Sequence, residues 1–252
     1  MASARVRIAA MGDIHCSRES AGTLREVFAA AADGSDAIVL CGDLTDYGLS
    51  EEAEVLVAEL AAAAGTPVVA VLGNHDHESG DAASVARILT EGGVRILDGD
   101  AHEAAGVGFA GTKGFGGGFG AGALGYWGED ANKRFVQEAI DEALKLESAL
   151  ARLRASTRVA VLHYSPIRDT VEREPEEIYA FLGSSRLEQP LGRYEVHAVF
   201  HGHAHKGTPE GRTSGGVPVY NVSMPLLREW FPDHPPFRVI ELPVVPEQGF
   251  EP

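Results

Sequence analysis

Three histidines lie close together in the stretch "FHGHAHKG" (200–207), directly after the apolar run "VHAVF": His201, His203 and His205. A single histidine is usually a surface residue or a buried residue whose hydrogen bonds are satisfied. Imidazole is also the commonest protein ligand for metal ions, and it is a frequent general acid or base. This clustering therefore favours a chemical role for at least some of the three.

Similar side chains follow four other apolar runs of the chain. In order, they are Asp13 and His15; Asp43; Asn74, His75 and Asp76; and His163. Carboxylate oxygens, an amide oxygen and imidazole nitrogens form a mixed ligand set that suits Mn, Fe, Zn or similar ions. The set lacks the thiolates of a structural zinc site. It predicts a metal centre that is assembled from several separate segments.

Strands and helices alternate in the first third of the chain. The runs "VRIAAMGD", "DAIVLCGD" and "PVVAVLGNHD" predict three strands, and the segments 17–34 and 50–65 between them predict helices. Ser17 or Ser20 is the expected cap of the first helix, and Ser50 that of the second. Polar residues just beyond the carboxyl ends of such strands line the ligand crevice. The acidic and histidine side chains at these ends should therefore converge.

The glycines at 12, 42, 73 and 202 precede these polar residues, and glycine allows a tight turn and a close backbone approach. From residue 94 the pattern changes to shorter apolar runs, a glycine-rich loop at 114–128, a long helix at about 129–155 and four further strands. The expected architecture is an α/β layered fold with a mixed sheet, or two stacked sheets, covered by helices. The glycine-rich loop is either a mobile wall that stacks a flat group or a surface loop with aromatic residues packed beneath it.

Length and composition favour one domain over residues 1–252, because 252 residues with 44% hydrophobic content can form one sizeable core. The 37 acidic and 21 basic residues give a net charge of -16. This charge argues against polynucleotide or an anionic membrane surface as a partner. Two cysteines, Cys16 and Cys41, and the lack of a leader-like or membrane-spanning apolar stretch favour a cytoplasmic location.

Five blocks of the sequence resemble, in type and order, those of the calcineurin-like metallophosphoesterase superfamily. They are Gly12-Asp13-Ile14-His15, Gly42-Asp43, Gly73-Asn74-His75-Asp76, His163 and Gly202-His203-Ala204-His205. A single block could arise by chance, but five on predicted strand ends are specific. The resemblance implies a metallophosphoesterase-type fold, with two stacked mixed β-sheets flanked by α-helices, and a cofactor of two metal ions, either Mn, Fe or Zn.

The resemblance also implies roles for individual residues. The residues Asp13, His15 and His205 would hold one metal, the residues Asn74, His163 and His203 the second, and Asp43 would bridge the two. His75 would not be a ligand: it would contact the substrate beside Asn74, as a proton donor or as a clamp on the phosphoryl group, with Asp76 orienting it. Two metal ions polarise a phosphoryl group and activate water near neutral pH.

The residues within the blocks favour one branch of the superfamily. In "GDLTDYG", Tyr47 stands where the Ser/Thr protein phosphatases have a phosphate-clamping arginine, and the third block ends in Asp76 where they have Glu. The blocks look more like those of class III cyclic nucleotide phosphodiesterases, which implies hydrolysis of small phosphodiesters such as cyclic nucleotides. Two alternatives stay open: a phosphomonoesterase acting on a small phosphorylated metabolite, and a non-catalytic metal-binding scaffold.

Some features have two interpretations. His201 either supports a ligand from behind or is a plain buried or edge histidine. His77 either lines the rim of the site or is a solvated loop residue. The charged segment at about 168–193 is either a cap inserted near the mouth of the site or a solvated helix.

Overall fold

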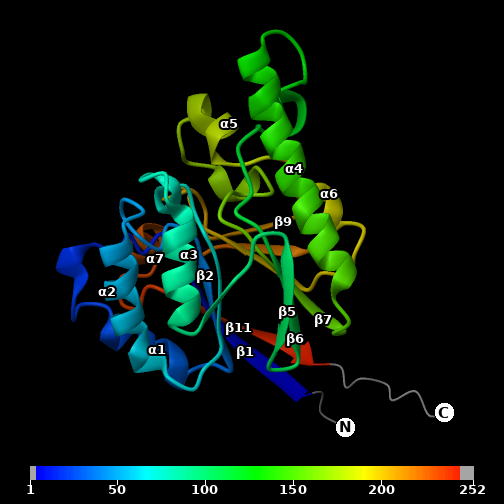
Figure 1. Cartoon of the computed structure of the whole chain (residues 1–252). Helices are drawn as coiled ribbons and strands as arrows, with labels where there is room; N and C mark the ends of the chain where they lie inside the picture. Colours follow the sequence, from blue (N-terminus) through cyan, green and yellow to red (C-terminus); the bar gives the residue numbers. More distant parts are fainter. Residues whose placement is uncertain (1–3, 245–252) are drawn as a thin grey trace.

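Two mixed β-sheets pack face to face in the computed structural model, which describes residues 4–244 (Figure 1). The first sheet has the strand order β11-β1-β2-β3-β4 and the second has the order β5-β6-β7-β8-β10-β9. The strands of the first sheet are β1 (Ala4–Met11), β2 (Ala37–Cys41), β3 (Val68–Val71), β4 (Val94–Ile96) and β11 (Arg238–Val244). Those of the second are β5 (Asp100–Ala104), β6 (Val107–Gly111), β7 (Thr157–Val161), β8 (Ala198–His201), β9 (Glu210–Arg212) and β10 (Pro218–Asn221).

The centre of each sheet is parallel, and antiparallel strands lie at the edges. β1, β2, β3 and β4 pair in parallel, as do β6, β7, β8 and β10, whereas β11, β5 and β9 pair antiparallel to their neighbours. This confirms the expected fold of two stacked mixed sheets. Because the central strands of each sheet run the same way, their carboxyl ends lie together at one edge.

The apolar core between the sheets joins them into one structure. It contains buried side chains from the first sheet, such as Ile8 and Val39, and from the second, such as Phe109 and Phe200. All four are completely buried. Strands that are buried on both faces have nearly continuous apolar sequences, which is why the central runs "AIVLC" and "VVAV" show no polar alternation.

Helices cover the outer face of each sheet (Figure 1). A second core packs α1, α2 and α3 on the first sheet, and a third core packs α4 and α6 on the second. The α-helices are α1 (Arg25–Asp33), α2 (Ser50–Leu60), α3 (Ala82–Glu91), α4 (Asp130–Arg152), α5 (Tyr179–Leu182), α6 (Glu188–Leu191) and α7 (Met224–Trp230). None of the helices within residues 4–244 has the length and apolar character needed to cross a bilayer.

The helix expected at 17–34 is divided in two. Ser17 caps a 3-10 turn at Arg18–Ser20, and α1 begins only at Arg25. Two features cause the interruption: Gly22 adopts a left-handed φ of 83°, and the buried Glu59 carboxylate accepts the backbone N–H groups of Gly22, Leu24 and Arg25. A carboxylate from α2 therefore satisfies the free donors at the start of α1, in place of a local serine cap.

The cap expected at Ser50 is also wrong. Ser50 is the first residue of α2, and the cap position is occupied by Leu49. The buried Glu52 side chain accepts the backbone N–H groups of Tyr47 and Leu49 instead.

The long helix expected at about 129–155 is present as α4, residues Asp130–Arg152.

The segment at 168–193 forms short helices rather than one solvated helix. It contains the 3-10 turns Asp169–Val171 and Glu176–Ile178 and the short helices α5 and α6. In Figure 1, α5 and the amino-terminal half of α4 rise together above the strand ends, and the glycine-rich loop connects β6 to this half of α4. The loop is bonded to the segment through Gly117 N–H to Ala180 O (2.7 Å) and Gly118 N–H to Gly183 O (2.9 Å).

Candidate metal centre

The predicted site residues follow the carboxyl ends of five parallel strands from both sheets. β1, β2 and β3 of the first sheet lead into Asp13, Asp43 and Asn74, and β7 and β8 of the second lead into His163 and His203. The sheets pack together, and their strand ends meet at one edge. Side chains that are far apart in the sequence are therefore brought into one cluster.

The backbone is strained at this cluster. Four of the predicted ligand residues adopt left-handed φ angles: Asp13 (54°), His15 (47°), Asp43 (48°) and His203 (69°). In the whole of residues 4–244, only two other residues besides glycine do so. Such conformations are uncommon outside glycine and gather at functional sites, where the surrounding structure holds them in place.

Glycine is needed where the backbone passes closest to the site. At Gly42, φ is 78° and an added Cβ would lie 2.5 Å from Nδ1 of His163. At Gly202, an added Cβ would overlap the Asp13 carboxylate and lie 2.9 Å from Cys41 O. The expectation that glycines allow close backbone approach is thus confirmed at these two positions.

The first ligand group consists of Asp13, His15 and His205. Their possible ligand atoms all lie within 4.8 Å of one another. His205 Nε2 is 3.0 Å from Asp13 Oδ1, and the rings of His15 and His205 meet edge-on with centroids 5.6 Å apart. The Asp13 carboxylate also accepts the backbone N–H of His203, which fixes its orientation.

The second ligand group consists of Asp43, His163 and His203, whose ligand atoms satisfy the same 4.8 Å limit. Asn74 belongs beside them, because its Oδ1 is 2.9 Å from His163 Nε2. His203 Nε2 lies 3.0 Å from the carbonyl oxygen of Phe181. When Nε2 carries the proton, its N–H donates a hydrogen bond to this carbonyl, and the lone pair of Nδ1 is free for a metal.

Asp43 lies between the two groups. Its Oδ2 is 3.8 Å from His15 Nε2, and its Oδ1 is 3.4 Å from His163 Nε2. One carboxylate oxygen therefore faces each group, so this one side chain can serve both groups as a bridging ligand. The side chain is almost fully buried, and the backbone N–H of His75 donates to Oδ1 (2.8 Å).

The hydrogen bonds of His163 test whether these residues fit metal ions. Its Nδ1 is 2.9 Å from Cys41 O, and its Nε2 is 2.9 Å from Asn74 Oδ1. A neutral imidazole has one N–H, so one ring nitrogen presents a lone pair to an oxygen that can only accept. A cation between Nε2 and Oδ1 removes this conflict, since two ligands at right angles on an ion with bonds of about 2.1 Å lie about 3 Å apart.

His15 gives a second indication of a fit. Its Nε2 is buried and has no hydrogen-bond partner among the described residues, and it faces Asp43. Nδ1 of the same ring is 3.2 Å from the Asp46 carboxylate. A buried nitrogen without a partner is costly, and metal coordination satisfies it. The donor set of imidazole, carboxylate and amide suits Mn, Fe or Zn.

The electrostatics of the cluster also suit a cation. Burial lowers the pKa of His163, and burial together with the neighbouring His163 lowers the pKa of His203 to about 4. Both rings are therefore neutral near pH 7, and neutral imidazole is the form that binds metals. Burial alone would raise the pKa of Asp13, but the hydrogen bond from His205 and the surrounding histidines bring it below its usual value. Burial and the nearby Asp13 raise the pKa of Asp43.

His75 lies beside the cluster, and its environment differs from the expected one. Its Nδ1 is 2.7 Å from the carbonyl oxygen of Asp46, and its ring meets that of His15 edge-on at 4.6 Å. One further group of possible ligands consists of His15, Asp43 and His75. His75 is therefore close enough to reach a substrate or an ion in the site, and its predicted non-ligand role stays a prediction.

Asp76 does not orient His75, contrary to the sequence-based expectation. It is completely buried, and its carboxylate accepts hydrogen bonds from Leu44 N–H, Thr45 N–H, the Thr45 hydroxyl and Gly73 N–H. These bonds connect the loop after β2 with the loop after β3. The reason is geometric, because the 3-10 turn at His75–His77 directs neighbouring side chains to different sides.

Asp46 is the residue that sequence reasoning missed. It contacts His15 through its carboxylate and His75 through its carbonyl oxygen. Its place three residues after Asp43, in the block "GDLTDYG", was the available signal.

His201 is a fully buried histidine: Nδ1 is 2.8 Å from Gly202 O and Nε2 is 2.8 Å from the Thr170 hydroxyl. His77 is exposed and lines a groove between α3 and α4.

Two adjacent groups of His and Asp side chains, with the Asp43 carboxylate facing both, define a candidate dinuclear metal centre. The family model of the calcineurin-like phosphoesterases matches residues 6–207. The chain belongs to this family, which confirms the resemblance seen in the five blocks. Its members typically depend on two metals, and membership supports a metal-dependent hydrolase acting on phosphoesters.

Solved structures with the same fold include three named hydrolases. Phosphopantetheinyl hydrolase from Mycobacterium tuberculosis has a TM-score of 0.66 at 14% identity, with 97% of this chain and 98% of that chain covered. A putative 5'-nucleotidase from Staphylococcus aureus has a TM-score of 0.53 at 14% identity, with 86% of this chain and 48% of that chain covered. A purple acid phosphatase from yellow lupin has a TM-score of 0.53 at 13% identity, with 81% of this chain and 38% of that chain covered. At these identities the likeness concerns the fold. No curated protein matches the sequence.

Proposed function

We propose that this protein hydrolyses small phosphodiesters and that two metal ions bind at the strand ends. The observation that carries the proposal is Asp43, whose two carboxylate oxygens face the two ligand groups at 3.8 and 3.4 Å. The residues Asp13, His15 and His205 would hold one ion, and the residues Asn74, His163 and His203 the other. When bound, the ions would neutralise charge on the phosphoryl group and lower the pKa of water at the site.

The protein's own residues would position the ester and handle protons. His75 would contact the phosphoryl group or donate a proton to the leaving oxygen, as a histidine near the reacting bond can do. The Asp46 carbonyl at 2.7 Å from Nδ1 supports this role. The N–H at Nδ1 donates a hydrogen bond to that carbonyl, and Nε2 is left to face the substrate. To protonate the leaving oxygen, Nε2 must carry a second proton, so the donor form of His75 is the imidazolium.

The charge of the site favours a diester over a monoester. In residues 4–244, the hydrogen bonds and ion pairs of the ligand side chains involve no arginine or lysine side chain. Tyr47, at the position of the protein phosphatases' arginine, is 57% exposed beside the cluster. A diester carries one negative charge and a monoester carries nearly two, so a monoester would need more cationic contacts. The net charge of -16 also favours a small substrate over a polynucleotide.

The test is hydrolysis of bis-p-nitrophenyl phosphate beside p-nitrophenyl phosphate. The full chain is stripped of metal, reloaded with Mn, Fe or Zn, and its bound metal is counted. We expect diesterase activity that returns with about two ions per chain. Faster turnover of the monoester would support the phosphomonoesterase alternative. Metal binding without turnover of either ester would support the scaffold alternative, and the absence of bound metal would overturn the proposal.

A further inference from the structure

A groove lies between α3 and α4, beside the loop that follows β3. Its volume is about 260 Å³, just below the range of about 300–1,000 Å³ that is usual for drug-sized ligands, so an occupant must be small. The apolar side chains that line it are Leu72, Ala82, Ala83, Ala86, Ile96 and Leu97. They offer a surface on which a small apolar group can be buried.

Three charged groups of the groove are engaged with one another. The Lys145 ammonium pairs with the carboxylates of Asp98 (2.9 Å) and Glu142 (2.8 Å). Glu142 also accepts hydrogen bonds from the Thr112 hydroxyl and from Gly114 N–H. The binding capacity of these groups is therefore largely used within the protein.

Lys113, which also lines the groove, has no carboxylate partner. Its Nζ donates to Gly114 O (2.8 Å), and it forms no ion pair within residues 4–244. The side chain is half-buried, and the ammonium lies 4.9 Å from the centre of the Phe115 ring and 5.3 Å from that of the Tyr164 ring. An ammonium group has three N–H donors, so two of them are left for a ligand.

Glu138 is the second charged group of the groove without a partner. It lies one turn before Glu142 on α4, and its exposed carboxylate has no hydrogen bond or ion pair in the described part of the chain. Burial lowers the pKa of the Lys113 ammonium, and the nearby carboxylates of Glu142 and Glu138 oppose this change. One free cation and one free anion therefore lie near each other beside the apolar surface.

The groove adjoins the metal centre. Lys113 O accepts the backbone N–H groups of His163 (3.0 Å) and Tyr164 (3.1 Å). His77 lines the groove from the 3-10 turn that also contains His75. The lining residues include none of the predicted metal ligands, so a molecule in the groove would lie beside the centre and not within it.

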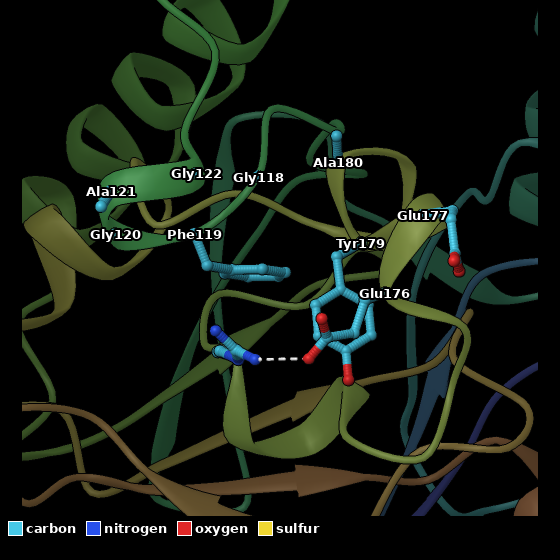
Figure 2. A pocket seen from close by; sticks show the side chains of 10 residues that line it. Gly118, Phe119, Gly120, Ala121, Gly122, Glu176, Glu177, Tyr179 and Ala180 are labelled. Atoms are coloured by element: carbon cyan, nitrogen blue, oxygen red, sulfur yellow. Dashed lines mark hydrogen bonds and ion pairs between the residues drawn. The ribbon is translucent and has the colours of Figure 1, made fainter.

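The pocket between the glycine-rich loop and α5 offers no comparable cation (Figure 2). Arg168 is the one cation among its lining residues, and its guanidinium already pairs with Glu176 at 3.0 Å. Phe119 and Tyr179 extend into this pocket and pack on the buried core around Ala204, beneath the ligand loop of the metal centre. An incoming carboxylate would have to displace a partner here, which it does not have to do in the groove.

The charges of the groove favour a ligand that carries both signs. An anion alone would pair with Lys113 but would also face Glu138, and a cation alone would meet the reverse problem. A zwitterion places an opposite charge on each of the two free groups. Its remaining atoms are then available for the apolar surface.

We propose that the groove between α3 and α4 binds a small α-amino acid with an apolar side chain. The carboxylate of the ligand accepts hydrogen bonds from Lys113, and its ammonium group donates to Glu138. Its side chain lies on Leu72, Ile96 and Leu97. This site is separate from the one proposed for the phosphodiester and does not depend on that reaction.

The experiment is calorimetric titration of the metal-loaded full chain with L-leucine. Two analogues each lack one charge: 4-methylpentanoate has no ammonium group, and 3-methylbutylamine has no carboxylate. Leucine should bind about tenfold or more tightly than either, because each analogue loses a charge-assisted hydrogen bond. Glycine, without the apolar side chain, should also bind about tenfold or more weakly.

Two substitutions test the assigned contacts. Lys113→Met and Glu138→Gln should each weaken leucine binding by about tenfold or more. Glu138 is exposed, so its variant should fold normally, and urea denaturation checks the fold of Lys113→Met. The matched controls are Lys133→Met and Asp141→Asn, on α4 but outside the groove, and they should bind leucine as the native chain does.

Several results would overturn the proposal. They are the absence of leucine binding at millimolar concentration, equal binding of leucine and either analogue, and leucine binding that survives both groove substitutions. The last result would place the amino acid elsewhere, for example on the metal ions. Hydrolysis of the p-nitrophenyl esters is measured separately, so the amino-acid site and the phosphodiesterase proposal can fail independently.

Discussion

At the scale of single residues, the site is formed by residues in unusual conformations with unusual hydrogen bonds. Left-handed φ angles occur at Asp13, His15, Asp43 and His203. Both ring nitrogens of His163 face oxygen atoms, one of Cys41 and one of Asn74. Each left-handed conformation costs about 1–3 kcal/mol. The surrounding structure must hold them in place, and metal ions bound at the site would offset part of this cost.

His75 and Asp43 should respond differently to substitution. His75→Ala should lower kcat by about 10²- to 10⁴-fold, because it removes a proton donor or a phosphoryl contact. It should retain two bound metals. Asp43→Ala should lose metal and activity together, because its oxygens face both ligand groups. Metal analysis and steady-state kinetics on both variants provide the check, and loss of metal from His75→Ala would make it a ligand.

Asp76 should matter for stability. Asp76→Asn replaces one acceptor oxygen with an NH₂ group that faces backbone donors of the loops after β2 and β3. We expect the free energy of unfolding to fall by about 3 kcal/mol, the cost of disrupting buried hydrogen bonds to a charged group. Urea denaturation measures this change. The control is Asp81→Asn at the exposed cap of α3, where asparagine caps equally well and stability should hardly change.

At the scale of elements, buried carboxylates replace the local signals that sequence reasoning relied on. Glu59 accepts a backbone N–H group at the start of α1, and Glu52 accepts the backbone N–H of Leu49 at the start of α2. Glu142 of α4 does the same for the glycine-rich loop: it accepts hydrogen bonds from the Thr112 hydroxyl (2.5 Å), Gly114 N–H (2.7 Å) and Lys145 Nζ (2.8 Å). One buried carboxylate therefore fixes the point where the loop leaves β6.

Removing this contact should loosen the loop. Glu142→Ala should destabilise the protein by about 2–3 kcal/mol, because buried donors are left unsatisfied. It should also speed proteolytic cleavage within 114–128. Glu138→Ala, at an exposed position of the same helix, is the matched control. Limited proteolysis followed by mass spectrometry locates the cuts, and equal cleavage of both variants would contradict a role for Glu142 in holding the loop.

At the scale of the whole molecule, the candidate metal centre lies where the two sheets meet. Asp13, Asp43 and Asn74 follow strands of the first sheet, and His163 and His203 follow strands of the second. Bound metal would therefore bridge the sheets and stabilise the folded state by mass action, by about 2.7 kcal/mol per ion at one hundred times Kd.

Metal removal should consequently lower the melting temperature. For a chain of this size, about 2.7 kcal/mol corresponds to a shift of about 5–10 °C per ion. Calorimetry of the metal-loaded chain, with and without chelator, measures the shift. The Asp43→Ala variant should show a much smaller response to the chelator. An identical melting temperature for the native chain in both conditions would argue against metal binding in the folded state.

The local sequence by itself determined the buried parallel strands, the layered fold and the residues of the candidate centre, but it missed the antiparallel edge strands β5 and β9. Buried parallel strands have continuous apolar runs, and the polar residues that follow them must lie at the ligand-binding edge. The motifs around Asp13, Asp43, Asn74, His163 and His203 were therefore recognisable from residue order alone.

Only the tertiary structure decided which groups contact one another. It separated Asp76 from His75, placed Asp46 beside His15 and His75, and brought Phe119 and Tyr179 to the core beneath the ligand loop. It also assigned the capping of α1 to Glu59, which is 34 positions beyond Arg25. The physical reason is that such contacts depend on side-chain direction and on the packing of distant segments. The periodicity of a single segment carries no information about either.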